Sequence, residues 1–435
     1  MIIINNERLL DLIQSNYSLE NIESIVTFLN AQKTFEFPAL KTGLFSAALL
    51  NSDTSYTGYS NVWVRDNVHI AHALYVLGKT EVAIRAMQTL MAFFEKYRHR
   101  FEDIIDNRVT PQNPMNRPHI RFNGQTLTEV DEEWSHAQND ALGYFLWLYC
   151  ILIRDGLIKP TRKTVEMLAL FPLYFQAIAY WEDEDSGHWE ETRKVEASSI
   201  GTVVAGLKAF KQLKMKPEFI AFCCQYKGRI VNPRLLDELL EKGYTALNQI
   251  LPAECIETDP LKNRRYDAAL LFLIYPLGVL QDKIADQILA DVQQHLVRDY
   301  GVCRYLGDSF WFADYKSILL SQQRTADFSG NITERNVFLK PRQEAQWCLF
   351  DPILSIIFGQ KFQKTLEVSY LAQQIHYLNR SLGQLTAVNS VFGGFKCPEL
   401  YYLAQGKYTP GDATPLLWTQ ANLALALKMF TQIKP

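Results

Sequence analysis

Two glutamates in aromatic surroundings are the residues of this 435-residue chain that most suggest chemistry. Glu190 follows Trp189 in an acidic turn, and Glu399 follows Pro398 in a loop rich in aromatic residues. A carboxyl group packed against an indole and near other carboxylates has a raised pKa, so it can keep a proton near neutral pH and act as a general acid. Glycoside hydrolysis typically uses one protonated and one ionised carboxyl. The two glutamates are therefore candidates for that pair.

Each glutamate also has a purely structural explanation. Most acidic side chains of the turn at 181–191 could simply be solvated, and Glu399 could be an ordinary loop carboxylate. The spacing of acids and glycine in the turn does not match an EF-hand calcium loop. The case for chemistry is the joint pattern, in which two separated glutamates each lie beside aromatic residues in loops of one helical chain.

A second aromatic and polar segment runs into a predicted helix. Tyr59 and Trp63 have flat apolar faces that suit the C–H faces of a sugar, and Arg65 offers a planar fork of donors. Asp66 is predicted as the helix N-cap. A buried tryptophan, a helix cap and a local ion pair would explain the same residues.

A third segment places Trp134 shortly before Gln138 and Asp140. The two polar residues lie at the start of a predicted helix, with Asn139 between them, so the three side chains are expected to point in different directions. Capping of the helix together with a solvated face is the alternative interpretation.

Helical periodicity predicts the elements that position these residues. In 80–97, Val82, Ala86 and Leu90 form one apolar stripe of a wide apolar face. Similar patterns predict helices at 6–16, 19–31, 66–78, 135–153, 162–180, 197–212, 232–248, 266–280, 284–297, 343–358, 362–379 and 415–431. Strand-like alternation is found mainly at 301–312. The sequence therefore predicts an all-α fold.

The connections between helices carry most of the polar and aromatic residues. The longer ones lie at 50–65, 100–134, 181–196, 299–342 and 381–414, and long connections in a compact domain are usually functional. In a ring of helix pairs, alternate connections gather at one end and can build a single pocket. Since no linker rich in Pro, Gly or Ser divides the chain, we expect one domain over 1–435, with about 1–35 as an N-terminal helical extension.

Composition and charge limit the kinds of molecule that the protein is expected to bind. The net charge is -3 and no basic run appears, which argues against nucleic acid. No stretch approaches the ~18 apolar residues of a membrane helix, and the residues after Met1 lack the positive region of a signal peptide. Seven scattered cysteines favour reduced thiols in a cytoplasm, without structural zinc. The oligomeric state is not indicated.

Taken in order, these segments resemble glycoside hydrolase family 15, the glucoamylases. They are still more similar to the N-terminal glucoamylase-like domain of the phosphorylase kinase α and β subunits. Gly187-x-Trp189-Glu190 resembles the family's general-acid motif, and Pro398-Glu399 resembles its general-base motif. The likeness runs from about residue 40 to 430 and includes the stretches 59–66, 134–140, 300–305, 346–347, 398–402 and 417–420.

The resemblance implies an (α/α)6 barrel, a six-hairpin toroid whose long loops form a pocket at one end. It implies an inverting, exo-acting hydrolase that releases glucose from the non-reducing end of α-glucans or maltooligosaccharides, with no metal or cofactor. Glu190 would protonate the leaving oxygen and Glu399 would deprotonate a water, with the carboxyls ~6.5–9.5 Å apart. The residues implied around the sugar are Tyr59, Trp63, Arg65, Asp66, Trp134, Gln138, Asp140, Trp189, Glu191, Arg264, Asp267, Tyr401 and Trp418.

Two other functions fit parts of the pattern. A non-catalytic carbohydrate-binding or regulatory module would suit the closer likeness to a kinase subunit. A helical toroid for another substrate, such as a prenyl chain, would need an apolar pocket with clustered aspartates, and the polar loops fit that poorly.

Overall fold

The computed structural model describes residues 2–49, 58–213, 216–222, 224–259, 262–320, 323–324 and 328–432. The fold is rich in helices, as the periodicity predicts. The longer helices are α1 (Leu19–Ala31), α2 (Val64–Val76), α3 (Thr80–Lys96), α5 (Asn139–Arg154), α6 (Arg162–Ala177), α7 (Ala197–Leu213), α9 (Pro233–Ile250), α11 (Asp282–His295), α14 (Phe350–Thr365), α15 (Val368–Gly383) and α16 (Leu417–Phe430). Shorter helices are η1 (Glu7–Leu12), α4 (His99–Ile105), η3 (Pro114–Asn116), α8 (Pro217–Ala221), η4 (Ala268–Leu270), α10 (Leu271–Ile274), α12 (Tyr315–Ile318) and α13 (Ile332–Phe338).

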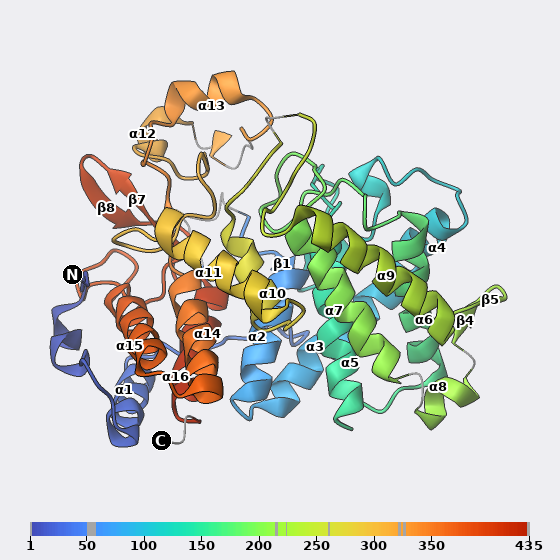
Figure 1. Cartoon of the computed structure of the whole chain (residues 1–435), viewed down its shortest axis with the longest axis horizontal. Helices are drawn as coiled ribbons and strands as arrows, with labels where there is room; N and C mark the ends of the chain where they lie inside the picture. The colour runs from blue at the N-terminus through green and yellow to red at the C-terminus, as the bar shows by residue number, and fades with distance from the viewer. Residues whose placement is uncertain are drawn as a thin grey trace.

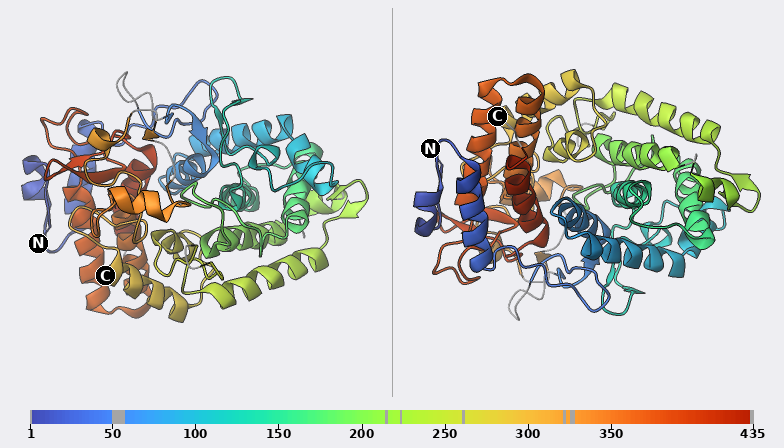
Figure 2. Two further views of the ribbon diagram at one scale, coloured as in Figure 1. Left: turned by 90° about the horizontal axis from the view of Figure 1, so that it is seen from above. Right: turned by 90° about the horizontal axis from the view of Figure 1, so that it is seen from below.

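Six helices contact one another in a closed sequence (Figure 1). α2 packs against α5 and α5 against α7, while the short α10 contacts both α7 and α14. α14 then packs against α16, which returns to α2. A second set lies on these helices, with α3 on α2, α6 on α5, α9 on α7, α11 on α10, α15 on α14 and α1 on α16. Figure 2 shows α1 beside the C-terminal helices at one end of the elongated molecule.

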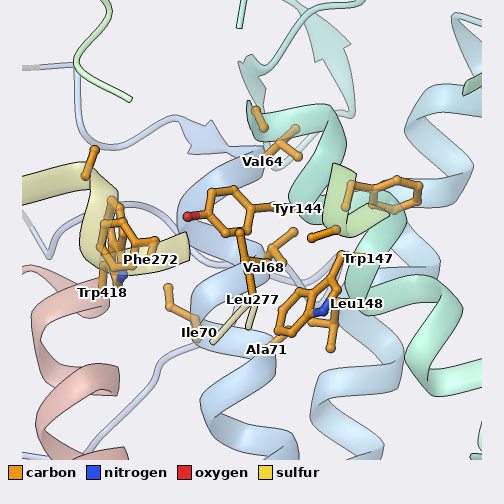
Figure 3. Close-up of a cluster of buried hydrophobic side chains, with 14 of the residues drawn as sticks. Val64, Val68, Ile70, Ala71, Tyr144, Trp147, Leu148, Phe272, Leu277 and Trp418 are labelled. Carbon is orange, nitrogen blue, oxygen red and sulfur yellow. The ribbon is translucent and has the colours of Figure 1, made fainter. Parts of the chain in front are cut away.

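Apolar side chains from the contacting helices fill the interior. Val68 of α2, Tyr144 of α5, Phe272 of α10 and Trp418 of α16 are buried and lie near one another (Figure 3). The ring centroids of Phe272 and Trp418 are 5.3 Å apart. Burying a side chain such as Val or Phe stabilises the fold by roughly 1.5–3 kcal/mol, so these contacts hold helices that are distant in sequence. No helix in the described ranges is long and apolar enough to cross a membrane.

Short antiparallel strands connect some of the loops. β1 (Val62–Trp63), β2 (Arg121–Asn123) and β3 (Thr128–Glu129) form one sheet, and β6 (Gln346–Trp347), β7 (Leu400–Ala404) and β8 (Lys407–Pro410) form another. A two-stranded sheet pairs β4 (Gln225–Tyr226) with β5 (Arg229–Ile230). In the second sheet Trp347 is opposite Leu400, so the strand after Glu399 is tied to the segment before α14.

The strand-like alternation at 301–312 forms no regular strand. The structure has only isolated bridges there, at Val302 and Tyr305. All of the residues 301–305 are buried. The alternation therefore does not mark a sheet with one buried and one solvated face.

Several helix boundaries also differ from the prediction. The segment 266–280 holds only η4 and α10, because Pro276 has no N–H to donate and disfavours helix at the residue before it. The helices expected at 343–358 and 362–379 lie later, and the break falls at Leu366, whose φ is +61°. Residues 6–16 contain only η1, and α4 and η3 lie in the expected connection at 100–134.

Candidate active site

A cavity of about 480 Å³ gathers loops that are far apart in the sequence. It receives side chains from the start of α2, the connection before α5, the turn before α7, the residue before β7 and the start of α16. Of the predicted residues, those that line the cavity are Tyr59, Trp63, Arg65, Asp66, Trp134, Trp189, Glu190, Glu191, Glu399 and Trp418. The fold thus brings the separate sequence motifs to one place.

The turn that presents Glu190 is built from unusual backbone conformations. Gly187 has φ +54° and Glu190 has φ +61°, a region that costs a non-glycine residue about 1–2 kcal/mol. A Cβ at position 187 would lie 1.4 Å from Glu196 Oε2, so glycine is required there. Ser186 O accepts from Glu191 N at 3.2 Å, which closes the turn and directs two consecutive glutamates differently.

The Glu190 carboxylate receives its closest donors from the start of α2. Trp63 Nε1 donates to Glu190 Oε1 at 2.7 Å, and Arg65 Nη2 lies 3.4 Å from the same oxygen. Burial raises the pKa of Glu190, and the nearby Arg65 charge opposes that rise. The raised pKa agrees with the sequence argument, but the indole that touches the carboxyl is a different one. Trp189 Nε1 instead donates to Asp267 Oδ1 at 3.0 Å, since the turn sends its indole away from the adjacent side chain.

Arg65 is a buried hub behind Glu190. Its Nη1 contacts Asp140 Oδ2 at 2.6 Å, and Gln138 Oε1 accepts from both terminal nitrogens at 3.1 Å. Asp140 raises the pKa of this guanidinium despite its burial, so Arg65 stays charged. Gln138 and Asp140 do not line the cavity and reach it through Arg65.

The capping predictions for these segments need correction. α2 begins at Val64 with Trp63 at the N-cap position, so Asp66 lies inside the first turn and is not the cap. Gln138 occupies the N-cap position of α5 but makes no side-chain cap, because its amide oxygen accepts from Arg65. Gln138 and Asp140 therefore converge on one partner. Burial raises the pKa of Asp66 to about 7.

Glu399 is fixed by the strands on both sides of it. Its N–H donates to Ala413 O at 3.1 Å, and its carbonyl accepts from Cys348 N at 2.9 Å. Tyr59 donates its hydroxyl to Glu399 Oε1 at 2.7 Å. Burial raises the pKa of Glu399 to about 8, and the Tyr59 hydrogen bond works against that rise.

Two aromatic rings connect the candidate catalytic glutamates. The centroids of Tyr59 and Trp63 are 5.4 Å apart, and each side chain donates a hydrogen bond to one of the two carboxylates. Trp134 packs edge-on to Trp63 at 6.1 Å and lies under the Arg121 guanidinium at 3.9 Å from the ring centroid. This wall of the cavity is therefore aromatic, with both carboxyl groups held at its edge.

Glu191 lies in the opposite electrostatic setting. Arg264 Nη2 is 2.7 Å and Arg304 Nη2 is 3.3 Å from its carboxylate, and the Tyr305 hydroxyl also donates to it. Although burial alone would raise the pKa of Glu191, the arginines hold it at about 2. This glutamate is a fixed anion.

Besides Gln138 and Asp140, three more of the residues predicted around the sugar do not line the cavity. Arg264 and Asp267 pair with each other at 3.1 Å behind Glu191 and Trp189. Tyr401 of β7 is buried; its hydroxyl donates to Gln384 O at 2.8 Å and accepts from Asn5 Nδ2 at 3.1 Å, which holds the ring away from the cavity.

Other lining residues were not singled out from the sequence. Arg304 and Trp347 lie inside the motifs that carry the family resemblance, and this position could have marked them as site residues. Phe310 and Phe328 belong to the long connection 299–342, where only the general richness in aromatic residues pointed to them. Further lining residues are Ala47, Pro114, Glu133, Ser135, His188, Ser309, Leu349 and Leu416.

The acidic turn before Glu190 is also less solvated than expected. Asp183 pairs with Arg117 at 2.6 Å, and Asp185 Oδ2 accepts from Asn139 N at 2.8 Å at the start of α5. Both Arg117 and Asp185 are buried. These acids attach the turn to neighbouring loops, which holds Glu190 at the cavity.

Comparison with known proteins places the chain in a family. The model for glycosyl hydrolases family 15 matches residues 27–390, so the chain belongs to this family. A probable phosphorylase b kinase regulatory subunit alpha of Caenorhabditis elegans is 25% identical over 413 residues, which are 86% of this chain and 31% of that protein. The chain thus spans less than a third of that relative.

Solved structures show the same kind of fold. A glycosidase variant in complex with glucose has a TM-score of 0.62 at 17% identity, over 95% of this chain and 98% of that one. A glucoamylase from Saccharomycopsis fibuligera has a TM-score of 0.56 at 13% identity, over 97% and 96% of the two chains. The chain therefore has a glucoamylase-like fold.

Proposed function

We propose that this protein is an inverting, exo-acting glycoside hydrolase that releases glucose from the non-reducing end of α-glucans or maltooligosaccharides. The observation that carries the proposal is that Glu190 and Glu399 line one cavity, with Glu399 buried and Glu190 partly buried. Glycoside hydrolysis needs one protonated and one ionised carboxyl. Burial favours the proton on Glu190, and the Tyr59 hydroxyl donates to Glu399 and favours its ionised form. Membership of the glycosyl hydrolase family supports the same chemistry.

In the proposed mechanism Glu190 donates its proton to the glycosidic oxygen as the bond breaks. Ionised Glu399 takes a proton from a water that attacks the opposite face of the sugar, so that the anomeric centre inverts. Tyr59 supports the ionised base by donating to Glu399 Oε1. Arg65 and Asp66 hold hydroxyl groups of the terminal sugar, while Trp63 and Trp134 contact its apolar face. No metal or cofactor takes part.

The architecture that we infer for this function is an (α/α)6 barrel formed by one domain. Support comes from the closed sequence of contacts among α2, α5, α7, α10, α14 and α16, and from the second set of helices packed on them. In such a barrel the cavity lies at one end and admits the end of a chain, which suits exo-action. The first ~35 residues would be an extension, since α1 packs on α16.

The test is release of glucose from maltotriose, with the anomer followed by NMR before mutarotation. We expect β-glucose from an α-linked substrate, and no release by Glu190→Gln or Glu399→Gln. Maltose, isomaltose and trehalose in the same assay would define the linkage. Retained configuration, or full activity of Glu190→Gln, would overturn the mechanism.

A second candidate function is a carbohydrate-binding or regulatory module without turnover. The likeness to a phosphorylase b kinase regulatory subunit favours it. The module would bind maltooligosaccharides with an affinity that Trp63→Ala abolishes, yet release no glucose. Titration calorimetry run beside the glucose assay separates the two functions, because only the enzyme consumes the ligand.

A further inference from the structure

One long connection touches both of the loops that carry the candidate catalytic glutamates. We call it the bridging segment and define it by residues 306–320, 323–324 and 328–342. It contains α12 and α13, which lie beyond α11 in Figure 1, close to the β7–β8 hairpin. Three sets of contacts attach it to the walls of the cavity.

The segment begins beside the Glu190 turn. Arg304 pairs with both carboxylate oxygens of Asp308, at 2.7 and 2.6 Å, and Asp308 Oδ1 also accepts from Phe310 N at 2.9 Å. The same guanidinium reaches Glu191, the residue after Glu190. The first residues of the segment are therefore held against the acid side of the cavity.

The segment next contacts the hairpin that starts immediately after Glu399. Asp314 N donates to Leu403 O at 2.7 Å, and Gln405 N donates to Asp314 Oδ1 at 2.6 Å. The ring of Trp311 packs edge-on against Tyr402 at 4.9 Å. Asp314 thus fastens the segment to the end of β7 and to the turn that follows it, in the hairpin next to Glu399.

It then returns to the Glu190 turn from the other side. Thr192 N donates to Ser329 Oγ at 3.1 Å, and Ser329 Oγ donates to Thr192 Oγ1 at 3.1 Å. A Cβ at Gly330 would lie 2.6 Å from Thr192 Oγ1, so glycine permits this close approach. Thr192 is two residues from Glu190, and Phe328, next to Ser329, lines the cavity.

We propose that the bridging segment fixes the two candidate catalytic glutamates relative to each other, with Ser329 positioning the Glu190 turn and Asp314 positioning the Glu399 hairpin. The inference rests on the proposed function. Its physical basis is that a misplacement of about 1 Å can cost ~100-fold in rate. The turn of Glu190 contains left-handed backbone, so an outside attachment helps to hold it.

The test uses variants that remove one attachment at a time. Ser329→Ala removes the hydroxyl at Thr192. Asp314→Gly removes the acceptor for Gln405 N but still tolerates the φ of +58° at this position. Asp314→Asn keeps an acceptor oxygen and should restore function. The matched control is Ser317→Ala, because the exposed Ser317 hydroxyl donates only within the segment, to Asp314 O at 2.8 Å.

We expect kcat for maltotriose to fall about tenfold in Ser329→Ala and Asp314→Gly, with KM changed less than about twofold, since neither residue lines the cavity. The pH profiles should move differently. In Ser329→Ala, looser packing should hydrate Glu190 and lower its pKa, so the alkaline limb of the pH profile should move to lower pH. The groups that face Glu190 are Trp63, Arg65, Gln138 and Arg121. Asp314→Gly should likewise hydrate Glu399 and lower its pKa, so the acid limb should move to lower pH. The groups that face Glu399 are Tyr59, Arg304, Asp66 and Asp308.

Kinetics and pH profiles indistinguishable from those of Ser317→Ala would overturn the inference. So would an equal shift of both limbs in both variants, which would indicate general loosening of the fold. If the unaltered protein releases no glucose, the proposed function fails, and hydrogen exchange then tests the inference separately. Ser329→Ala should speed exchange at 186–192 and Asp314→Gly at 400–404, while unchanged exchange at both would overturn it.

Discussion

Glu190 and Glu191 are neighbours in the chain, yet the fold gives them opposite properties. Glu190 faces the cavity and has a raised pKa, because burial outweighs the attraction of Arg65. Glu191 has a pKa of about 2, because Arg264 and Arg304 surround it. The first can give up a proton in a reaction and the second cannot. The difference shows that chemistry at this turn depends on which charges the tertiary structure brings to each carboxylate.

The largest expected effect comes from removing the protonated member of the pair. Glu190→Gln should lower kcat for maltotriose by at least ~10²–10⁴-fold, because general acid catalysis contributes about that much. Thermal unfolding should change little, since the amide is nearly isosteric. Glucose release and the melting temperature are measured together, and a stable variant with full activity would show that Glu190 is not the general acid.

Glu191, which stays ionised, should contribute to the stability of the fold. Glu191→Ala leaves Arg304 and Arg264 with less compensation in a buried site, and removal of one partner of such a cluster costs about 3–5 kcal/mol. The measurement is the free energy of unfolding in urea. Glu166→Ala is the control, because Glu166 forms an exposed pair with Arg162 and should cost no more than about 0.5 kcal/mol. Equal losses in both variants would contradict this prediction.

The role of Glu399 as the base can be tested through the pH dependence of activity. Tyr59→Phe removes the hydroxyl that donates to Glu399 and stabilises its ionised form, so the pKa of Glu399 should rise above about 8. The acid limb of kcat/KM should then move up by about one pH unit, a shift equivalent to ~1.4 kcal/mol. A limb that stays in place, or moves down, would show that Glu399 does not set it.

A further expected effect is on the pH dependence of stability. The pKa of Glu399 is about 8 in the folded protein and ~4.3 in an unfolded chain, so its protonated form stabilises the fold below ~4.3 and that contribution is lost as pH rises through 8. Glu399→Gln cannot ionise, so its melting temperature should exceed that of the parent at pH 8 but not at pH 4. Glu191→Gln should show the reverse sign at pH 8, because the folded pKa of about 2 makes ionised Glu191 stabilising at all higher pH.

The parts of the fold with strong local patterns were predictable. The apolar stripe of α3 and the start of α7 at Ala197 follow from side-chain spacing and match the structure closely. α10 was not predictable as a four-residue helix, because its apolar residues fit a longer helix until Pro276 interrupts it. The start of α14 lies about seven residues later than predicted, since Ala345, Trp347 and Leu349 extend the apolar pattern while Gln346–Trp347 pair as β6.

The candidate site was predictable as a set of motifs and less so as a set of contacts. Trp63, Arg65, Trp134, Glu190 and Glu399 meet in one cavity as their shared sequence character suggests. The partner of Glu190 was not predictable, because the adjacent Trp189 turns toward Asp267 while the distant Trp63 donates to the carboxylate.

The helical architecture and the family to which the chain belongs follow from the sequence alone. These depend on local spacing and on the order of motifs along the chain. Only the tertiary structure decided the pKa of each glutamate, the indole beside Glu190 and the attachment of the bridging segment to both loops. Those features depend on desolvation and on charges within a few ångströms in space, and the groups responsible, such as Arg304 near Glu191, lie more than a hundred residues away in the chain.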